Sequence, residues 1–562
     1  MTHTVTHIDF RANTQHVPPH MPPSVQKATS KFLGNRAALV DIIGQDNWQA
    51  LRQAGHDLRM HAIDNLDLYL EQVEQRVTEA GGHVHWARDA AEAQQIVLDI
   101  AREHGVRRVV KSKSMATEEI ELNPALQAAD ISVVETDLGE YIIQLAGVTP
   151  SHIIVPAVHL TKEGIADLFT EKLGIDAPPD PKVLTQIAHE RLREEFLNAD
   201  MGISGANFIV AETGTIVVVS NEGNARMCTT LPPLHVAVVG IDKVVPDMQS
   251  LAVLLKLLAR SATGQKMSCY TSFITGPRRE ADEGGPQEFH LVLLDNGRTR
   301  VLQDEVTRET TLCIRCGACL NTCPVYNSVG GHAYGWVYSG PIGAILAPQL
   351  LGTKVASDLP FASSLCGACG EICPVKIPIP QILLRLRHRV MEGDAVEPPV
   401  SPSSARAAAS AGAAVLASPF LYGAAASMGN VAQAPLVRGG WIQSLPPPLN
   451  RWTDVRPFPT VQGGFRAWWQ EHTPEPPDPA LAASTEEATV STEPVAENID
   501  VQTTEIGVAA MTADEPKAPT SPDEVTPASP ESSRRQKAVK AIVMVAVLVL
   551  ITYAVREWRK RS

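Results

Sequence analysis

The chain has 562 residues, of which 44% are hydrophobic and 20% charged, and its formal net charge is −14. A chain of this length exceeds what one hydrophobic core supports, so we expect two to four domains. The acidic balance leaves no basic stripe along the sequence, which argues against a nucleic-acid-binding protein.

Residues 1–60 are polar and mixed with helical patches, and they predict an N-terminal helical segment. The stretch "MTHTVTHIDFRANTQ" has no apolar core, so we expect no signal peptide and a cytoplasmic location. Seven of the nine cysteines fall in two short motifs. In a reducing compartment that arrangement favours metal binding over a disulfide framework.

Residues 61–303 predict an α/β domain with a largely parallel sheet. A helical pattern from residue 65 ends at Gly81 and Gly82, and strands then alternate with helices. The later helices are expected at 89–105, 117–129 and 162–174. The strands are expected at 83–87, 107–112, 131–137, 151–159, twice within 206–221, and at 234–245. The block closes at 288–302 with an expected strand, an Asp-Asn-Gly turn and a second strand.

Residues 304–390 contain both cysteine motifs and predict a small α-helical domain of ferredoxin type. The first motif has Cys313, Cys316, Cys319 and Cys323, the last followed by proline. Cys-x2-Cys-x2-Cys-x3-Cys-Pro is the spacing of a 4Fe–4S ligand loop, in which the fourth cysteine reaches the other cluster. Zinc also binds Cys-x2-Cys pairs, but the successive spacing before Cys-Pro favours iron–sulfur.

The second motif has only three cysteines, and Ser363 stands where its first cysteine would be. Crossing the fourth ligands predicts two clusters, one held by Cys313, Cys316, Cys319 and Cys373, and the other by Cys323, Cys366 and Cys369. Three ways of completing the second remain open: Ser363 itself, a 3Fe–4S cluster, or a 4Fe–4S cluster with water or a partner's residue on its unique iron. Ser363 is the less favoured, because a serine alkoxide is a poor ligand at neutral pH.

Five residues of the α/β block and of the segment between the two motifs have ordinary explanations. We expect Cys228 and Cys269 to be small buried hydrophobes. His332 and Tyr334 are expected to pack against a cluster without binding it, and His235, inside an apolar strand, is expected to be a core histidine.

Three segments follow: an Ala-, Trp- and Pro-rich extension at 391–472, a disordered acidic linker at 473–536, and an apolar helix at 537–556. Thirteen acids and one base fall within 473–533, with few large apolar residues. Ala541 to Val555 carry no charge and span roughly 22 Å as a helix, short of the ~30 Å hydrocarbon core. Snorkelling of Lys540 and Arg556 closes most of that gap, so we expect a tail anchor at the cytoplasmic face of the membrane.

"CIRCGACLNTCPVYNSVGGHAYGW" and "SSLCGACGEICPVKIPIPQ" resemble the lactate-utilisation iron–sulfur family called LutB or YkgF. The α/β block resembles the LUD domain of that family in "KSKSMATEEIELN", "VETDLGEYIIQLAG" and "ETGTIVVVSNEGNARM". "WTDVRPFPTVQGGFRAWWQEH" resembles the family's C-terminal extension. The resemblance covers about residues 30–472 and implies two 4Fe–4S clusters with the same crossed ligands.

The resemblance also implies a function. It points to an electron-transfer subunit of a complex that oxidises L-lactate to pyruvate, together with two companion proteins, LutA-like and LutC-like. We expect no flavin here, because no Gly-x-Gly-x-x-Gly fingerprint follows a strand.

The LUD domain is similar in fold to sugar-phosphate isomerases and CoA transferases, whose ligands lie beyond the carboxyl ends of the strands. The candidate residues there are Lys111, Ser112, Lys113, Ser114, Glu135, Thr136, Asp137, Glu140, Asn221, Glu222, Gly223 and Asn224. Lys111 or Lys113 is expected to bind a carboxylate or phosphate, and Glu135 or Glu140 to act as a base. Solvated polar loops at strand ends are an equally weighted alternative.

Two other functions are consistent with the sequence. In the first, the LUD block is itself an enzyme on a carboxylate or CoA-type substrate, and the clusters act as redox sensors. In the second the chain is a scaffold whose clusters are structural. The pairing of two cluster motifs favours electron transfer, because a structural role rarely needs two clusters side by side.

Overall fold

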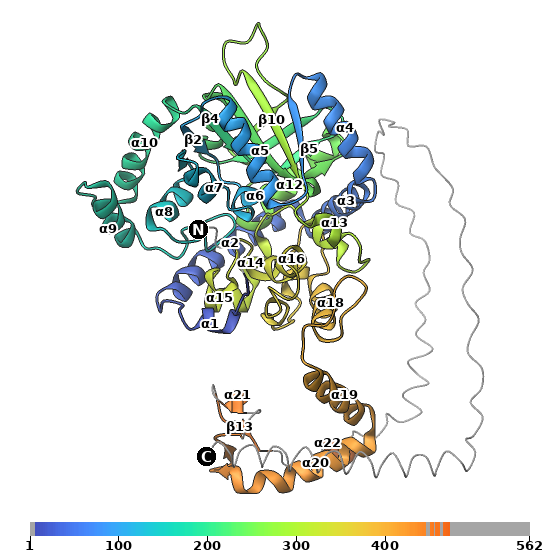
Figure 1. Cartoon of the computed structure of the whole chain (residues 1–562). Coiled ribbons are helices and arrows are strands. Elements are labelled where there is room, and N and C mark those ends of the chain that lie inside the picture. Colours follow the sequence, from blue (N-terminus) through green and yellow to red (C-terminus); the bar gives the residue numbers. More distant parts are fainter. Residues whose placement is uncertain (1–5, 446–449, 454–455, 461–464, 473–562) are drawn as a thin grey trace, which may run out of the picture. The chain divides into compact units, whose positions relative to one another are not determined.

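The computed structural model describes residues 6–445, 450–453, 456–460 and 465–472 (Figure 1). The predicted acidic linker at 473–536 and apolar helix at 537–556 lie outside these residues. The chain divides into two compact units, Met1–Arg406 and Ala407–Ser562, which are described separately.

The first unit is built on a six-stranded parallel sheet with the order β1-β10-β7-β4-β2-β3. Its strands are β1 (His83–Ala87), β2 (Arg108–Lys111), β3 (Ser132–Glu135), β4 (Met201–Ser204), β7 (Leu234–Gly240) and β10 (Glu288–Leu294). The central strand β7 is buried along its whole length, as expected for a parallel sheet covered on both faces. The predicted α/β fold with a parallel sheet is therefore confirmed.

Helices and a second sheet cover the two faces of this sheet. Apolar residues of α5 (Ala90–Glu103) and α7 (Leu122–Ala128) pack on one face. On the other face, α4 (Leu66–Glu79) and a smaller sheet pack against β7 and β10. The smaller sheet has the order β8-β5-β6-β9, with strands β5 (Phe208–Val210), β6 (Thr215–Ser220), β8 (Val244–Val245) and β9 (Tyr270–Ile274).

Three more helices form a separate apolar cluster near β2. They are α8 (Leu138–Ala146), α9 (Lys162–Leu173) and α10 (Pro181–Leu197). Two shorter helices follow strands, α6 (Met115–Glu119) after β2 of the main sheet and α11 (Asn224–Thr230) after β6 of the smaller sheet. Each of these begins just beyond a carboxyl end of a strand, which is where ligands bind in such folds.

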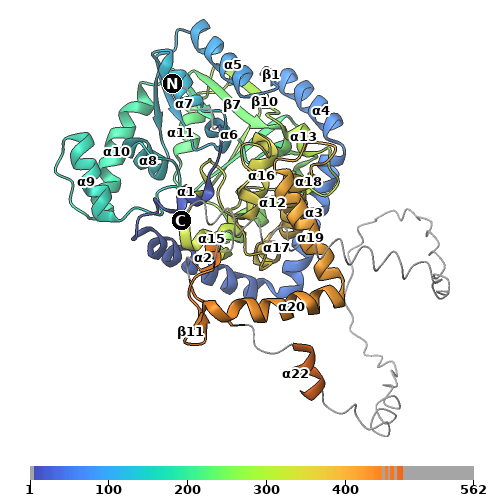
Figure 2. The same ribbon diagram turned by 60° about the horizontal axis from the view of Figure 1, so that its bottom comes forward.

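The cysteine region consists of short helices that share a core with the N-terminal segment. Its elements are η2 (Arg308–Leu312), α14 (Ala318–Thr322), α15 (Pro324–Val329), η3 (His332–Tyr334), α16 (Gly340–Leu351), η4 (Leu359–Phe361), α17 (Ala368–Ile372) and α18 (Ile379–Glu392). One apolar cluster joins them to α2 (Met21–Ile43), α3 (Gln45–Asp64) and α12 (Met248–Thr263), and Figure 2 shows these helices side by side. The cysteine region is thus packed into the first unit; the predicted boundaries at 60, 303 and 390 stay predictions.

Two expected strands are wrong. Residues 151–159 form turns, because their polar groups bond within the segment and to the cysteine region: Tyr326 donates its hydroxyl hydrogen to the Ser151 carbonyl at 2.7 Å. Residues 298–301 form the helix α13 (Arg298–Val301), which begins after Gly297 at φ 89°. Asp295 accepts from the Thr299 amide at 2.7 Å and so stabilises this helix start.

The helix expected at 117–129 is divided into α6 and α7 at Glu121, whose φ is +50°. The strand expected at 234–245 is divided into β7 and β8 by the short helix η1 (Ile241–Lys243), and two strands were missed, β4 and β9. β4 contains Gly202, where a Cβ atom would lie 1.8 Å from the Cys228 carbonyl oxygen, so close approach of α11 requires glycine.

The second unit contains α20 (Pro419–Gln433), η5 (Ala434–Leu436), α21 (Asn450–Thr453), α22 (Phe465–His472) and a small sheet of β11 (Val437–Arg438), β12 (Trp441–Ile442) and β13 (Phe458–Pro459). The helix α19 (Ser403–Ala417) crosses the division between the units. Within the described ranges no single helix meets the length and hydropathy needed to cross a membrane. The stretches Ser403–Ala417 and Pro419–Leu436 reach that length and hydropathy only when taken together, and they are bent by 107° at the break between them.

Candidate iron–sulfur centres and the adjoining cavity

The two cysteine loops have the same backbone conformation. Arg315 and Leu365, which precede the second cysteine position of each loop, have φ values of 58° and 55°. Gly317 and Gly367, which follow it, have φ values of 79° and 86°. Each loop then enters a five-residue helix, α14 or α17, that ends at a cysteine in extended conformation. The two motifs are therefore structural equivalents, residue by residue.

Four cysteines from the two motifs surround one small cavity. Cys313, Cys316, Cys319 and Cys373 line it together with apolar side chains that include Ile153, Ile342 and Ile377. Backbone amides point at two of the sulfurs: Arg315 donates to Cys313 Sγ at 3.4 Å, and Ile377 donates to Cys373 Sγ at 3.4 Å. Apolar walls and amide donors to sulfur are the surroundings that tune iron–sulfur clusters. The residues present thus fit a cluster at this set.

Cys323, Cys366 and Cys369 form a second set. Burial first, and then the charge of Cys323, raises the pKa of Cys369 to about 11. Burial also raises the pKa of Cys323, and the charge of Cys366 contributes to that rise. Tyr326 donates its amide to Cys323 Sγ at 3.5 Å. Cys366 is exposed, whereas Cys323 and Cys369 are buried. The second set therefore faces the solvent on one side.

The spacing of the sulfurs argues against a single zinc ion. Around a tetrahedral Zn²⁺ with Zn–S bonds of ~2.3 Å, the sulfurs are about 3.8 Å apart. Among the described residues, no three cysteine sulfurs lie within 4.8 Å of one another. All nine cysteines are free of disulfides. A wider spacing suits a multi-iron cluster, which separates its ligands further.

A larger cavity of about 310 Å³ joins the sheet to the first cysteine set. One side is formed by residues just beyond the carboxyl ends of β2, β6 and β7, including Lys113, Asn221 and Lys243. The other side is formed by Ile314, Arg315 and Cys316. This volume falls within the range of small-molecule sites. Because Cys316 lines both cavities, a molecule bound in the larger one lies next to the first cysteine set.

Ionisable side chains are concentrated beneath one wall of this cavity. Lys111 is fully buried and forms a 2.7 Å ion pair with Glu135. Burial alone would lower the pKa of Lys111, but Glu135 and Glu118 outweigh it and raise that pKa. Lys113 Nζ lies 3.6 Å from Glu140 Oε1, and both atoms are buried without a hydrogen-bond partner in the described structure. Burial raises the pKa of Glu118 to about 7 and that of Glu140 well above its usual range.

A second buried network fixes the cavity's other wall. Arg298 pairs with Glu119 at 2.8 Å and with Asp242 at 2.6 Å. Arg315 lies 3.4 Å from the other oxygen of Asp242, and Tyr338 donates its hydroxyl hydrogen to Glu119 at 2.7 Å. These residues come from α6, α13, the loop after β7 and the cysteine region, so the network ties the first cysteine loop to the sheet.

The predicted strand-end residues have different positions. Lys113, Ser114, Asp137, Asn221, Glu222 and Asn224 line the larger cavity. Lys111, Ser112, Glu135, Thr136, Glu140 and Gly223 do not line it, and Lys111, Glu135 and Glu140 form the ionisable group behind its wall. The lining residues Lys243, Arg298, Arg315 and Tyr338 were missed, as was Glu118 behind the wall. Lys243 follows the carboxyl end of β7, so the strand-end argument already contained the signal for it.

The remaining candidates have mixed outcomes. Cys228 is buried and contacts the Thr136 hydroxyl at 3.2 Å, but Cys269 is exposed, so the expectation of burial is wrong for Cys269. It precedes β9, an edge strand of the smaller sheet. His235 is buried in β7 and bonded to Ser204 at 2.8 Å, as expected for a core histidine.

Tyr334 is buried, and the charges of Cys323, Cys319 and Cys369 contribute to the raised pKa of its hydroxyl after burial itself. It shares one buried apolar cluster with Cys323 and Cys369, which agrees with the expected packing near the cysteines. His332 instead bonds to the Thr149 carbonyl at 2.7 Å. The cluster ligands themselves stay a prediction that the geometry accommodates.

Comparison with known proteins gives two domain matches and a family. Residues 70–294 match the LUD domain and residues 309–377 match a 4Fe-4S dicluster domain. The predicted order of an α/β LUD domain followed by a ferredoxin-type 4Fe–4S domain is therefore confirmed. A solved structure of a DUF162 family protein from Deinococcus radiodurans is 16% identical, covers 41% of this chain and 98% of its own, and has a TM-score of 0.22.

Lactate utilization protein B of Bacillus thuringiensis (strain Al Hakam) is 44% identical over 450 residues, which cover 80% of this chain and 93% of the relative. The proteins of the same name from Bacillus cereus (strain Q1) and Bacillus anthracis (strain A0248) give the same values. The resemblance inferred from the motifs is thereby confirmed, and the chain belongs to the lactate utilization protein B family.

Proposed function

We propose that this protein is the iron–sulfur electron-transfer subunit of a complex that oxidises L-lactate to pyruvate. The observation that supports it is the cavity of about 310 Å³ with the LUD strand ends on one side and Cys316 on the other. Two bound iron–sulfur clusters supply acceptors for single electrons. A carboxylate substrate in this cavity is then adjacent to the first of them.

The lining of the cavity suits a small hydroxy acid. Lys113 and Lys243 line it, with Lys113 Nζ buried 3.6 Å from Glu140 Oε1 and Lys243 Nζ donating to the Cys313 carbonyl at 3.5 Å. A lactate carboxylate is the kind of group that such an amine binds. Asn221 and Asn224 line the same space and offer amide groups to a hydroxyl. Oxidation of lactate also releases protons, which a base must accept. Glu140 is kept protonated by burial and is therefore a poor base. Asp137 lines the cavity and is better placed to accept a proton.

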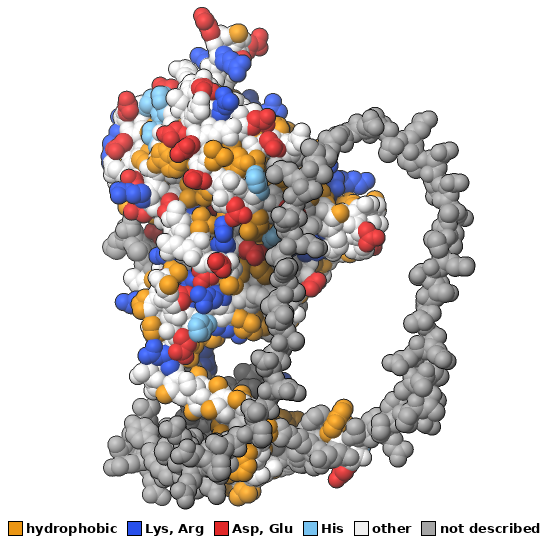
Figure 3. All heavy atoms as spheres, turned by 90° about the vertical axis from the view of Figure 1, so that its right-hand side faces the viewer, with side chains coloured by type: hydrophobic (Ala, Val, Ile, Leu, Met, Phe, Trp, Pro, Cys, Tyr) orange, Lys and Arg blue, Asp and Glu red, His pale blue; other side chains and the backbone are white. Residues whose placement is uncertain are grey.

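The second cysteine set supports an exit for electrons to a partner. Cys366 is exposed, and Phe361, close to it in the sequence, exposes 48% of its surface. The lactate utilization name of the relatives implies companion Lut proteins, so we include a LutA-like and a LutC-like protein among the partners. Charges of both signs are interspersed on the face in Figure 3, without a continuous basic stripe among its described residues, in keeping with a protein partner.

The proposed location is the cytoplasmic face of the membrane, with the uncharged run from Ala541 to Val555 as the anchor. This part of the proposal rests on the sequence alone, because the run lies outside the described residues. An acidic segment of some sixty residues separates the part of the chain that resembles the family from this apolar run.

The test is spectroscopic. The full chain is purified anaerobically with its co-purifying partners, and its electron paramagnetic resonance is recorded before and after L-lactate is added, with D-lactate and buffer as controls. Cluster signals that appear on addition of L-lactate support the proposal. Clusters that stay oxidised, with both partners present, overturn it.

A second function is favoured by a separate observation, the group formed by Lys113 in the cavity lining with Glu118 and Glu140 behind it. Perturbed carboxyl groups of this kind occur at catalytic sites. In this alternative the LUD domain is an enzyme on a carboxylate or CoA-type substrate, and the clusters sense redox state. Turnover of such a substrate with the clusters held oxidised would select it over electron transfer.

A further inference from the structure

We infer that Ser363 Oγ is the fourth ligand of the second cluster. The inference rests on the proposed second cluster and does not depend on lactate as the electron donor. It starts from the equivalence of the two loops, in which Ser363 and Cys313 occupy the same position.

The side chains at these two positions have the same orientation. In the first loop the amide of Arg315 donates to Cys313 Sγ at 3.4 Å. In the second loop the amide of Leu365 donates to Ser363 Oγ at 3.2 Å. The donor is two residues beyond the acceptor in both loops, and both donors have a left-handed backbone. Ser363 Oγ therefore lies where the first loop presents a sulfur ligand.

The surroundings favour an oxygen ligand at this corner. Arg387 donates to the Ser363 carbonyl at 3.0 Å, which brings a guanidinium charge next to the serine. Ser363 is half-buried and close to the exposed Cys366, so its proton has a route to water. Binding replaces the O–H bond by an O–Fe bond and releases that proton to the solvent. The positive charges of iron and Arg387 both lower the cost of this deprotonation.

The test compares Ser363→Ala and Ser363→Cys with wild type and with a matched control, Ser364→Ala, which removes an exposed neighbouring hydroxyl. Mössbauer spectra and iron content are measured on the anaerobic full chain. We expect wild type, Ser364→Ala and Ser363→Cys to hold two four-iron clusters, and Ser363→Ala to lose one iron and show an oxidised three-iron signal.

Two results would overturn the inference. One is a Ser363→Ala protein with the iron content and Mössbauer spectrum of wild type, which would assign the corner to water or a partner. The other is hyperfine coupling to ¹⁷O in reduced wild type after transfer to H₂¹⁷O, since a serine oxygen does not exchange. A wild-type chain with only one cluster would instead refute the proposed second cluster, which keeps the two failures distinct.

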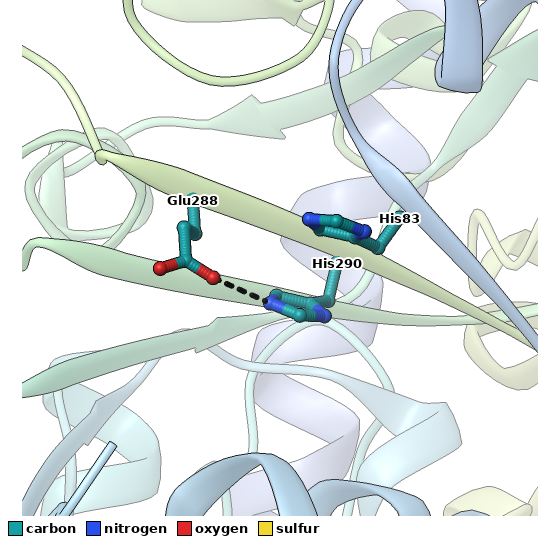
Figure 4. Close-up of side chains that lie close together, drawn as sticks. All are labelled: His83, Glu288 and His290. Atoms are coloured by element: carbon teal, nitrogen blue, oxygen red, sulfur yellow. Dashed lines mark ion pairs between the residues drawn. The ribbon is translucent and has the colours of Figure 1, made fainter. Parts of the chain in front are cut away.

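A separate observation supports a second site, at the amino ends of the strands and so at the opposite edge of the sheet from the cavity. Ligand atoms of His83, Glu288 and His290 lie within 4.8 Å of one another, and Figure 4 shows the three side chains facing the same space. His83 and His290 are register partners in β1 and β10. We propose that these three residues bind Zn²⁺, for which imidazole nitrogen and carboxylate oxygen are ordinary ligands.

Neighbouring histidines orient the proposed ligands. His85 Nε2 lies 3.0 Å from His290 Nδ1, which leaves His290 Nε2 to face Glu288 at 3.6 Å. That Nε2 atom is buried without a hydrogen-bond partner among the described residues, and His290 is only 7% exposed. His104 bonds to Glu288 Oε2 at 3.1 Å. Outer residues that fix the ligands in this way are typical of metal sites.

Calorimetric titration of the untagged full chain, with its clusters intact, tests the site with Zn²⁺. His83→Ala removes an exposed ligand and is expected to weaken the tightest binding step about tenfold or more. His189→Ala, which removes an exposed histidine on α10, is the matched control. Equal zinc affinity in wild type, His83→Ala and Glu288→Gln would overturn the proposal.

Discussion

Arg315 Nη2 lies 3.4 Å from Asp242 Oδ2, and both side chains are almost completely buried. One residue belongs to the first cysteine loop and the other follows the central strand of the LUD sheet. Burial would raise the pKa of Asp242, but Arg298, Lys243 and Arg315 hold it well below its usual range. The loop and the sheet are thus joined through a carboxylate that stays charged, which fixes the wall between the cavity and the first cysteine set.

Asp242→Asn is expected to destabilise the protein by about 3–5 kcal/mol, because it leaves the buried Arg315 without its carboxylate and Arg298 with Glu119 alone. Urea unfolding of the cluster-loaded chain, followed by circular dichroism, measures the change. Glu79→Gln breaks an exposed pair with Arg76 and should leave stability nearly unchanged. An Asp242→Asn protein as stable as Glu79→Gln would contradict the assigned role of the network.

Lys113→Gln is expected to weaken lactate-dependent cluster reduction roughly 10- to 100-fold, as loss of a charged hydrogen bond to a carboxylate would. The lactate concentration for half-maximal reduction, read from the visible absorption of the clusters, is the measurement. Lys256→Gln alters an exposed lysine on α12 and should leave that concentration unchanged. Reduction by dithionite should be the same in all three proteins, and an unchanged response of Lys113→Gln to lactate would exclude Lys113 from substrate binding.

His235 predicts a specific pH dependence of stability. Burial lowers the pKa of His235 to about 3, so between that value and its ordinary 6.5 the unfolded chain binds a proton that the folded chain does not. Stability therefore falls as the pH falls below 6.5, by about 1.4 kcal/mol per unit. Between pH 7 and pH 5, the free energy of unfolding of His235→Gln should fall by about 2 kcal/mol less than that of wild type. Urea unfolding at both pH values measures the difference.

His189→Gln, at an exposed histidine, is the control for that experiment and should keep the wild-type slope. A His235→Gln protein with the wild-type slope would mean that His235 is protonated in the folded chain, contrary to its burial beside Ser204 and Phe289.

The sequence was most informative where chemistry requires a fixed spacing. The cysteine motifs and the alternation of strands and helices were readable because ligand geometry and burial leave a pattern along the chain. The strand expected at 151–159 was wrong. Its apolar residues, such as Ile153, are buried in the core shared with the cysteine region, and a buried turn segment has the same apolar composition as a strand. Glu119, Asp242 and Arg298 are far apart in the sequence, so only the fold brings their charges together.

The tail provides a prediction that the sequence alone supports. Removing residues 534–562 deletes the uncharged run and its basic flanks, and the truncated protein should move from the membrane fraction to the supernatant of lysed cells. Cluster absorption should be unaffected, since all seven motif cysteines remain. A truncated protein still in the membrane fraction would refute the anchor and point to a partner as the attachment.

The exposure of the two cysteine sets predicts an order of electron transfer. Cys316 lines the cavity, whereas Cys366 is exposed on the second set, so the two substitutions should fail at different steps. Cys316→Ala should abolish lactate-dependent reduction of the whole protein. Cys366→Ala should leave the first cluster reducible by lactate. The rate of electron transfer to an added acceptor should fall by at least about tenfold, which corresponds to a barrier higher by roughly 1.4 kcal/mol or more.

Stopped-flow absorption for cluster reduction and dye reduction for transfer separate these steps, and Cys269→Ala is the control because that exposed cysteine lies outside both motifs. If Cys366→Ala blocked the response to lactate while Cys316→Ala left it intact, electrons would enter from the solvent side. The cavity would then serve a different ligand, and the exposed set would be the point at which a partner delivers electrons.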